Sequence, residues 1–392
     1  MTTDRIYLDH NATSPLRRSV LEVMRPFIEG SQANPSGVHV EARQARAAVD
    51  RARAQVANFL GALPDEIVFT SGGTESNNLA VLGAVEGHPA GEIIVSALEH
   101  QSVLDPCRRL MKQGHRVRLL LSDRIGRVRH RVLPGLISPQ TRLVSVMAAN
   151  NEVGTLQPVE EIASVAREHG VLMHTDAVQA AGKVHLDVVR LGVDLLTLSA
   201  HKLGGPQGVG ALYIRRGVSL EPRSLGGPHE RNRRAGTENV AGIVGFGAAC
   251  AMVLDTQVQD VRRLERLRRR LYEGIRAQCA GVSLNGDPRH HLANTLSLRF
   301  DGVDAAALEI DLDLSGVAVS RGSACSAGSE EGSHVLKAMG LRPAQVRSAI
   351  RFSLGHDTAL EEVDRAAAIV ARMVDAQRTS GPGELVLLGA NT

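Results

Sequence analysis

The feature that most constrains the fold of this chain is the alternation of short apolar runs with helical patterns. Apolar runs typical of strands stand at 67–69, 93–95, 143–147, 171–173 and 195–198, and helical spacings lie between them. This alternation predicts an α/β fold with a mostly parallel sheet covered on both faces by helices. Because 392 residues exceed the size at which a single core usually divides, we expect two domains.

Polar residues follow each of the five predicted strands. In open α/β sheets, ligands bind outside the carboxyl ends of the strands, so we expect these polar side chains to converge on one edge. In chain order they are Ser71-Gly-Gly-Thr74, His100, Asn151, Asp176 with Gln179, and Ser199 with His201 and Lys202.

The organisation of the chain changes near residue 258. The segment 261–275 places its apolar residues on one helical face, and six arginines lie between Arg262 and Arg270. We interpret these arginines as the solvated face of a linking helix, and a docking patch is the alternative. Apolar runs at 295–300, 317–320 and 350–353 predict the strands of a smaller α+β domain. We therefore predict a large domain at 15–258, a small domain formed by 1–14 and 259–380, and a loose tail at 381–392.

Composition excludes several classes of function. The chain has no Trp and only 6 Phe and 3 Tyr, so stacking platforms for single-stranded nucleic acid are nearly excluded. A net charge of +3 is too small to indicate an anionic polymer as partner.

No apolar stretch approaches the ~18 residues of a membrane span, and the N-terminus lacks a signal core, so we predict a cytoplasmic protein. The cysteines, Cys107, Cys250, Cys279 and Cys325, form no C-x-x-C pair, and we predict neither a disulfide framework nor a metal site.

Lys202 is the strongest candidate for a reactive amine. Only four of the 45 cationic residues are Lys, and Lys202 alone ends an apolar strand. In an apolar setting the pKa of a lysine falls and its amine can form a Schiff base. The alternative is a surface lysine before a loop. The other three, Lys112, Lys183 and Lys337, are interpreted as surface residues.

A glycine-rich turn and an aspartate add to this candidate site. The turn at 71–74 would leave N–H groups free at a helix N-terminus, which suits a phosphate, although it matches neither a Walker A loop nor a G-x-G-x-x-G fingerprint. Asp176 alone is most simply a helix N-cap. Pyridoxal phosphate enzymes, however, need a carboxylate at the pyridinium nitrogen. Together with Lys202 and the turn, Asp176 favours the cofactor interpretation.

Three further residues have a functional and a structural interpretation. His100 could stack on a planar ring or move protons, although a lone His is more often structural. Cys325 lies in a run at 322–333 that is rich in Gly and Ser, so we expect it to be exposed and reactive, although a free cysteine is usually buried as a small apolar residue. Arg351 could hold a carboxylate bidentately, or it could form a surface ion pair.

At this point the motifs resemble a known family. The chain is similar to the cysteine desulfurases, in the class V aminotransferase group of fold-type I pyridoxal phosphate enzymes, from Tyr7 to about Met373. It resembles most the iron–sulfur and nitrogenase-assembly branch, which has a long cysteine loop. The motifs that carry the resemblance are Asn34-Pro-Ser, Thr70-Ser-Gly-Gly-Thr-Glu-Ser-Asn-Asn, Glu99-His100, Asn150-Asn-Glu-Val-Gly, Asp176-Ala-Val-Gln, Ser199-Ala-His-Lys, Arg234-Ala-Gly-Thr-Glu-Asn, Gly322-Ser-Ala-Cys and Arg351-Phe-Ser-Leu-Gly.

The resemblance implies a role for each candidate residue. Lys202 would carry the cofactor and move protons at Cα, and Cys325 would attack the substrate sulfur. Asp176 would pair with the ring nitrogen, Gln179 would reach the ring oxygen, and His100 would stack on the ring. The phosphate would be held by Gly73, Thr74, Ser199 and His201, with Thr237 from the partner subunit of a homodimer, and the substrate carboxylate by Asn151 and Arg351.

The implied reaction converts L-cysteine to L-alanine and leaves a persulfide on Cys325 for a sulfur acceptor, either an iron–sulfur scaffold or a tRNA-thiolation enzyme. The alternatives are a selenocysteine lyase or another lyase or transaminase on the same scaffold, and a sulfur carrier that has lost catalysis. The chain departs from the family at Gln207, where relatives often have Lys, and at His10 and Ser14 near the N-terminus. None of these three positions belongs to the implied chemistry.

Overall fold

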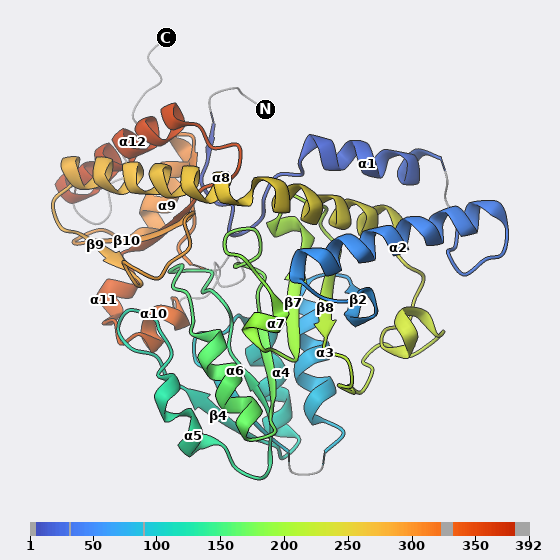
Figure 1. Cartoon of the computed structure of the whole chain (residues 1–392). Helices are drawn as coiled ribbons and strands as arrows, with labels where there is room; N and C mark the ends of the chain where they lie inside the picture. Colours follow the sequence, from blue (N-terminus) through green and yellow to red (C-terminus); the bar gives the residue numbers. More distant parts are fainter. Residues whose placement is uncertain (1–4, 31–32, 89–90, 323–331, 381–392) are drawn as a thin grey trace. The chain divides into compact units, whose positions relative to one another are not determined.

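A computed structural model describes residues 5–30, 33–88, 91–322 and 332–380 (Figure 1). Contacts within the chain group it into two compact units. The larger unit is formed by Thr13–Asn150 and Thr155–Val258. The smaller unit is formed by Met1–Ala12, Asn151–Gly154 and Gln259–Thr392.

The larger unit is built on a seven-stranded sheet with the order β2-β8-β7-β6-β5-β3-β4. Strands β4, β3, β5, β6 and β7 are parallel, whereas β8 is antiparallel to both β7 and β2. All residues of β2, β3, β7 and β8 are buried, which explains why these strands are mostly apolar rather than alternating between apolar and polar residues. The predicted mostly parallel α/β sheet is therefore confirmed. The strands are β2 (Ile67–Thr70), β3 (Glu92–Ser96), β4 (Arg116–Leu120), β5 (Thr141–Ser145), β6 (Leu172–Asp176), β7 (Leu195–Ser199) and β8 (Gly210–Ile214).

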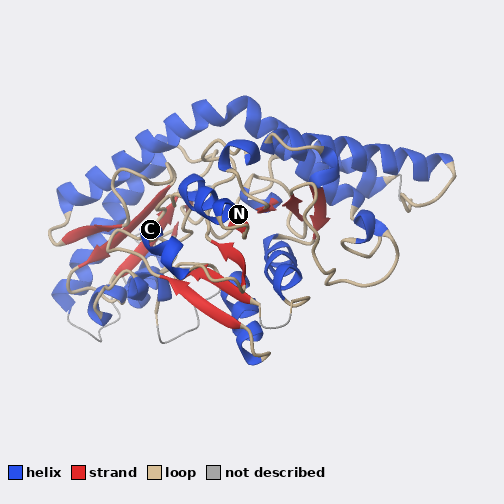
Figure 2. Ribbon diagram, turned by 60° about the horizontal axis from the view of Figure 1, so that its bottom comes forward, coloured by secondary structure: helices blue, strands red, loops and turns tan. Residues whose placement is uncertain are grey.

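Helices flank this sheet (Figure 2). Helix α2 ends because Gly61 adopts a left-handed conformation, with φ of 64°, and its N–H bonds to Ala57 and Asn58 carbonyls. The helices of this unit are α1 (Arg18–Glu29), α2 (Val40–Leu60), α3 (Gly73–Val85), α4 (Gln101–Lys112), α5 (Leu133–Leu136), α6 (Val159–Glu168) and α7 (Val188–Leu191).

Helix α8 (Val240–Gln278) is one continuous helix of 39 residues. The separate helix predicted at 261–275 is only its last part. Residues 242–250 are buried on every side, so they show no amphipathic period that would reveal the helix. By length and composition α8 could cross a membrane, but 61% of its most apolar window is buried, as in the core helix of a globular protein.

The smaller unit has an antiparallel sheet with β10 (Thr295–Phe300) between β9 (Val282–Asn285) and β12 (Ala349–Ser353). A second, parallel pair joins β1 (Ile6–Tyr7) to β11 (Val317–Ala318). The strand predicted at 317–320 is too long, because Ser320 instead makes an isolated bridge with Arg351. Helices α9 (Ala305–Leu314) and α12 (Leu360–Ser380) belong to this unit, with the short α10 (His334–Ala338) and α11 (Pro343–Val346).

The arginine-rich part of α8 is not a uniformly solvated face. Arg263 donates to the carbonyl oxygens of Gly355, His356 and Thr358, and so fixes the turn before α12. Arg268 is buried and pairs with Glu265 at 2.8 Å. The interpretation as solvated arginines is therefore wrong for Arg263, which holds the turn before α12, and for Arg268, which is buried and paired within α8.

A buried ion pair anchors the 3-10 helix η4 (His229–Asn232) in the larger unit. Arg53 of α2 makes two hydrogen bonds of 2.7 Å to Glu230, and Glu230 also accepts from the Phe69 N–H at 2.9 Å. Glu230, Arg231 and Asn232 have φ of 46°, 56° and 63°. Three successive non-glycine residues with positive φ are costly, so the ion pair offsets a strained segment.

We expect Glu230→Ala to lower the free energy of unfolding by about 3–5 kcal/mol, because it leaves the Arg53 charge buried without its partner. Urea denaturation followed by circular dichroism measures the loss. Asp65→Ala is the control, because it removes the exposed pair with Arg216 and should change stability little. Equal losses in the two variants would contradict the role of the buried pair.

Candidate active site

The strand directions of the larger unit place the predicted residues at one edge of its sheet. Strand β2 runs in the same direction as β3, β6 and β7, because β8 is antiparallel to both of its neighbours. The carboxyl ends of these four strands therefore share an edge. That edge carries the glycine turn after β2, His100 after β3, Asp176 at the end of β6 and Ser199 at the end of β7.

The glycine turn is shaped by close packing. Gly72 has φ of 151°, which favours glycine, and Gly73 is the first residue of α3. A Cβ on Gly73 would lie 2.9 Å from the Val178 Cγ2 and 3.7 Å from the Ser199 Cβ. The turn thus lies against the segments that follow β6 and β7. The first N–H groups of α3, including those of Gly73 and Thr74, have no partner within the helix and can bind an anion.

Asp176 is buried, and its carboxylate is held at both oxygens. The Val178 N–H donates to Oδ1 at 2.9 Å, and the Asn77 Nδ2 donates to Oδ2 at 2.7 Å. The bond from Val178 is the turn expected of a capping aspartate, but no helix begins there. The interpretation of Asp176 as a helix N-cap is therefore wrong, and its carboxylate has a fixed orientation.

His100 is connected to Asp176 by a chain of hydrogen bonds. The Asn77 Nδ2 donates to the Ser102 Oγ at 2.8 Å, and that hydroxyl lies 2.8 Å from the His100 Nδ1. The Ser102 N–H also donates to the same Nδ1 at 3.1 Å, so His100 caps α4. Because Nδ1 accepts this bond, Nε2 carries the proton of the imidazole. Asn77 is not among the site residues predicted from the sequence. The only signal it leaves there is that it is a polar residue on a helix that is buried nearly all round.

Glu99 is a fully buried acid near these residues. Burial raises its pKa well above the ordinary value, a hydrogen bond from the Met147 N–H opposes this, and the nearby Asp176 raises the pKa further. The environment of Glu99 thus favours its uncharged form.

Lys202 follows β7 in the 3-10 helix η3 (Ala200–Lys202) and is half-buried. The neighbouring His201 has its Nδ1 3.0 Å from the Thr13 Oγ1. Burial, and then the charges of Lys202 and Lys183, lower the pKa of His201 to about 4. His201 is thus a neutral imidazole at physiological pH, and it offers a hydrogen bond without adding positive charge.

Lys183 corrects one sequence interpretation. It is half-buried rather than a surface residue, and its Nζ donates to both the carbonyl oxygen and the Oε1 of Gln179, each at 3.1 Å. This contact leaves no signal in the sequence, because the turn that brings position 183 back toward position 179 has no periodic pattern. Lys112 and Lys337 are exposed, as predicted.

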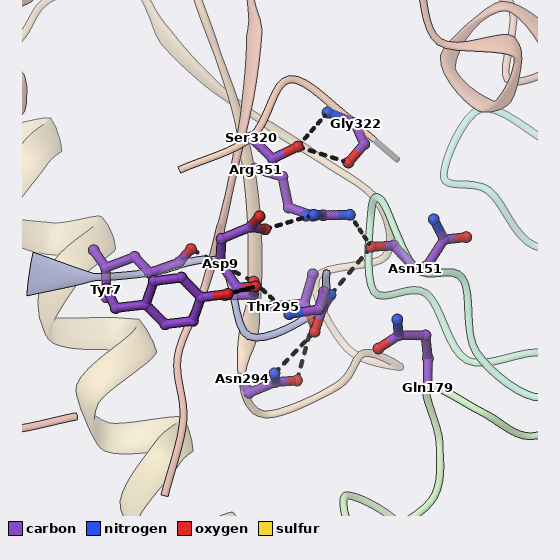
Figure 3. A network of polar contacts seen from close by, with 12 residues as sticks. Tyr7, Asp9, Asn151, Gln179, Asn294, Thr295, Ser320, Gly322 and Arg351 are labelled. Carbon is purple, nitrogen blue, oxygen red and sulfur yellow. Dashed lines mark hydrogen bonds and ion pairs between the residues drawn. The ribbon is translucent and has the colours of Figure 1, made fainter. Parts of the chain in front are cut away.

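Arg351 is the centre of a polar network in the smaller unit (Figure 3). Its side chain is 2% exposed, so the interpretation as a surface ion pair is wrong. The Arg351 Nη2 donates to the Asp9 Oδ1 at 2.7 Å, and Nη1 donates to the Asn151 carbonyl oxygen at 3.0 Å. Asn11 donates to the same carbonyl and to the Thr295 hydroxyl. Among the described residues, the Arg351 Nε has no hydrogen-bond partner, which leaves a buried donor for a ligand.

The remaining predicted residues lie outside these two groups. Thr237 is exposed on the loop that follows η4, where Arg234 pairs with Glu75 of α3 at 2.8 Å. Cys325 and most of its loop lie outside the described residues. Cys107, Cys250 and Cys279 are free and buried, and burial raises the pKa of each thiol, to about 12 for Cys107. A buried thiol with a raised pKa is a poor nucleophile, so these three cysteines suit structural positions.

The residues of the larger unit fit pyridoxal phosphate. The start of α3 offers N–H groups to a phosphate, and the fixed Asp176 carboxylate suits a pyridinium nitrogen. Lys202 supplies an amine for attachment. Within the described part of the chain, no three His, Cys, Asp or Glu side chains are grouped so that they could hold a metal ion.

Comparison with known proteins gives a consistent family. The model of the aminotransferase class-V family matches residues 6–366. A protein of Dictyoglomus turgidum named cysteine desulfurase IscS is 42% identical over 379 residues, covering 96% of each chain. A cysteine desulfurase of Bradyrhizobium diazoefficiens is 44% identical over 379 residues, again covering 96% of each chain.

Solved structures extend the similarity to the whole fold. A structure described as a NifS-like protein superimposes with a TM-score of 0.90 at 36% identity, covering 95% of this chain and 100% of the other. A structure described as SspA in complex with cysteine gives a TM-score of 0.79 at 36% identity, covering 89% of this chain and 98% of the other.

We expect Asn77→Ala to weaken the binding of pyridoxal phosphate about 10- to 100-fold, because Asp176 loses a hydrogen bond to its charged carboxylate. Equilibrium titration of the apoprotein with the cofactor, followed by absorbance, measures the effect. Asn78→Ala is the matched control, because the neighbouring Asn78 side chain donates to the Thr74 carbonyl oxygen rather than to Asp176. Identical affinities for the two variants would refute the orienting role of Asn77.

Proposed function

The chain belongs to the class-V aminotransferase family and is a pyridoxal-phosphate-dependent cysteine desulfurase, and from this premise we propose that it leaves the substrate sulfur as a persulfide on Cys325. The carbon skeleton of the L-cysteine substrate is released as L-alanine. The observation that carries the proposal is the buried Asp176 carboxylate, fixed by Asn77 and Val178 in the unit that also carries Lys202.

Different residues of the larger unit are proposed to bind different parts of the cofactor. Pyridoxal phosphate, when bound, supplies an electron sink that stabilises negative charge at the substrate Cα. Asp176, oriented by Asn77 and Val178, would keep the ring nitrogen protonated. Lys202 binds the cofactor through its amine, His100 stacks on the ring and Gln179 donates to the ring oxygen. The phosphate is held by Gly73, Thr74, Ser199 and His201, and by Thr237 of the partner subunit in a homodimer.

Arg351 and Asn151 are proposed to bind the carboxylate of L-cysteine. The guanidinium is held by Asp9 and by the Asn151 carbonyl, so its plane is fixed before the substrate arrives. Its Nε and the side-chain amide of Asn151 are donors suited to a carboxylate. The relative described as bound to cysteine supports this amino acid as the substrate.

Lys202 is proposed to remove the proton from the substrate Cα and to return a proton as alanine forms. A lysine can do so only while its amine is uncharged. Lys202 is half-buried, and burial favours the uncharged form of an amine. His201 is neutral at physiological pH and would add a positive charge to the phosphate side only at low pH, where it becomes protonated.

Cys325 completes the reaction by accepting sulfur. Its thiolate attacks the substrate sulfur, the new S–S bond forms as the C–S bond breaks, and the electron pair of the C–S bond remains on the carbon that becomes the alanine methyl group. In sum, L-cysteine and the Cys325 thiol give L-alanine and the Cys325 persulfide, with no external oxidant. The backbone of Ser320, which precedes Cys325 in the sequence, pairs with the backbone of Arg351. The chain therefore leads toward Cys325 from a point beside the proposed carboxylate-binding residue, which supports this role.

The persulfide is proposed to pass to an acceptor protein for iron–sulfur cluster assembly or tRNA thiolation. A cytoplasmic location fits the three free cysteines among the described residues, because reducing compartments keep such thiols unpaired.

We expect Cys325→Ala to retain pyridoxal phosphate but to lose steady-state turnover, because the sulfur has no acceptor thiol. Alanine formed from L-cysteine in the presence of a thiol reductant is the measurement, and cofactor absorbance reports binding. Cys250→Ala is the control, because that thiol is buried in α8 and should leave turnover intact. Undiminished alanine formation by Cys325→Ala would rule out the persulfide step.

A further inference from the structure

Two of the four lysines of the chain belong to the same part of the larger unit. Lys202 carries the proposed chemistry, whereas the family motifs give Lys183 no role. Its Nζ makes two hydrogen bonds of 3.1 Å, and both acceptors, the carbonyl oxygen and Oε1, belong to Gln179. Gln179 is itself buried, with 6% of its surface exposed. The partly buried ammonium thus bonds to both the backbone and the side chain of this glutamine, which limits how its amide can turn.

The backbone around Lys183 is fixed on both sides. Gly182 has φ of 75°, and a Cβ there would lie 2.8 Å from the Cδ2 of Leu203, the residue that follows Lys202. On the other side, Gln257 of α8 donates to the Val184 carbonyl oxygen at 2.6 Å. The turn that carries Lys183 is therefore packed against the segment that carries Lys202.

The chemistry of the contact determines which end of the glutamine amide faces Lys183. An ammonium group has three donors and no acceptor, so it can bond only to the oxygen of a carboxamide. With Oε1 held by Lys183, the other end of the amide is the Nε2 donor. If the amide turned over, Nε2 would meet the ammonium and the amide oxygen would face the ring oxygen, so two unfavourable contacts would form together.

We propose that Lys183 is a positioning residue that holds the Gln179 amide so that Nε2 donates to the ring oxygen of bound pyridoxal phosphate. This inference rests on the proposed function only for the placement of Gln179 at that oxygen. The Lys183 ammonium acts through the amide and also adds positive charge to this side of the site, as its effect on His201 indicates. An arginine would keep the charge, but its planar guanidinium bonds differently from a compact ammonium.

The colour of the bound cofactor tests this proposal without any substrate. The visible absorbance of the holoenzyme changes with pH, and donation to the ring oxygen favours the anionic form of that oxygen. We expect Lys183→Met to move the midpoint of this change upward by about one pH unit, and to weaken cofactor binding about tenfold, as for the loss of one hydrogen bond to a charged group. Lys183→Arg should recover part of the shift. Lys112→Met removes an exposed lysine of α4 and should leave the midpoint unchanged.

A double-substitution cycle separates positioning from charge alone. If Lys183 acts through the amide, adding Lys183→Met to Gln179→Ala should shift the midpoint by much less than Lys183→Met does alone, because only the direct effect of the lost charge remains. Fully additive shifts, or an unchanged midpoint in Lys183→Met, would overturn the proposal.

Alanine formation by the wild-type protein separates this proposal from the proposed function. An unshifted midpoint in Lys183→Met, with a wild type that makes alanine, would overturn the role of Lys183 alone. A shifted midpoint, with a wild type that makes no alanine, would support Lys183 and overturn the proposed function.

Discussion

The common direction of β2, β3, β6 and β7 is the constraint on which the rest of the site depends. Because β8 is antiparallel to both of its neighbours, the edge strand β2 keeps the direction of the parallel strands, and its glycine turn reaches the same edge as Asp176 and Ser199. A sheet in which β2 ran the other way would put the start of α3 at the opposite edge. The anion-binding helix end, the carboxylate and the reactive amine would then be separated by the length of a strand.

The site keeps its ionised groups few by favouring the neutral form of their neighbours. Burial raises the pKa of Glu99, which lies near Asp176, and lowers the pKa of His201, which precedes Lys202 in the chain. Asn77, with both hydrogens of its amide donated, ties Asp176 to the serine that contacts His100. Burial makes each of these bonds necessary, because a buried charge or amide without a partner would be costly. The same burial strengthens the electrostatic attraction between the Asp176 carboxylate and a positive ring nitrogen.

Much of this arrangement follows from the sequence, because apolar strands and the polar residues after them are visible as a pattern. Lys202, Asp176 and the glycine turn are found in this way. Other features leave no pattern. Asn77 lies on a helix that is buried nearly all round, and the first half of α8 is hidden for the same reason.

Contacts across turns and between distant segments are also invisible in the sequence. The bond between Lys183 and Gln179 depends on a turn, and the burial of Arg351 depends on Asp9, which lies 342 residues away in the chain. The predicted domain boundaries at 14, 258 and 380 stay a prediction.

The measurement that tests the central claim most directly is the yield of alanine and sulfide from L-cysteine and a thiol reductant with the purified, cofactor-loaded protein. The account predicts steady formation of the two products in equal amounts. A yellow, cofactor-loaded protein that forms no alanine would contradict it.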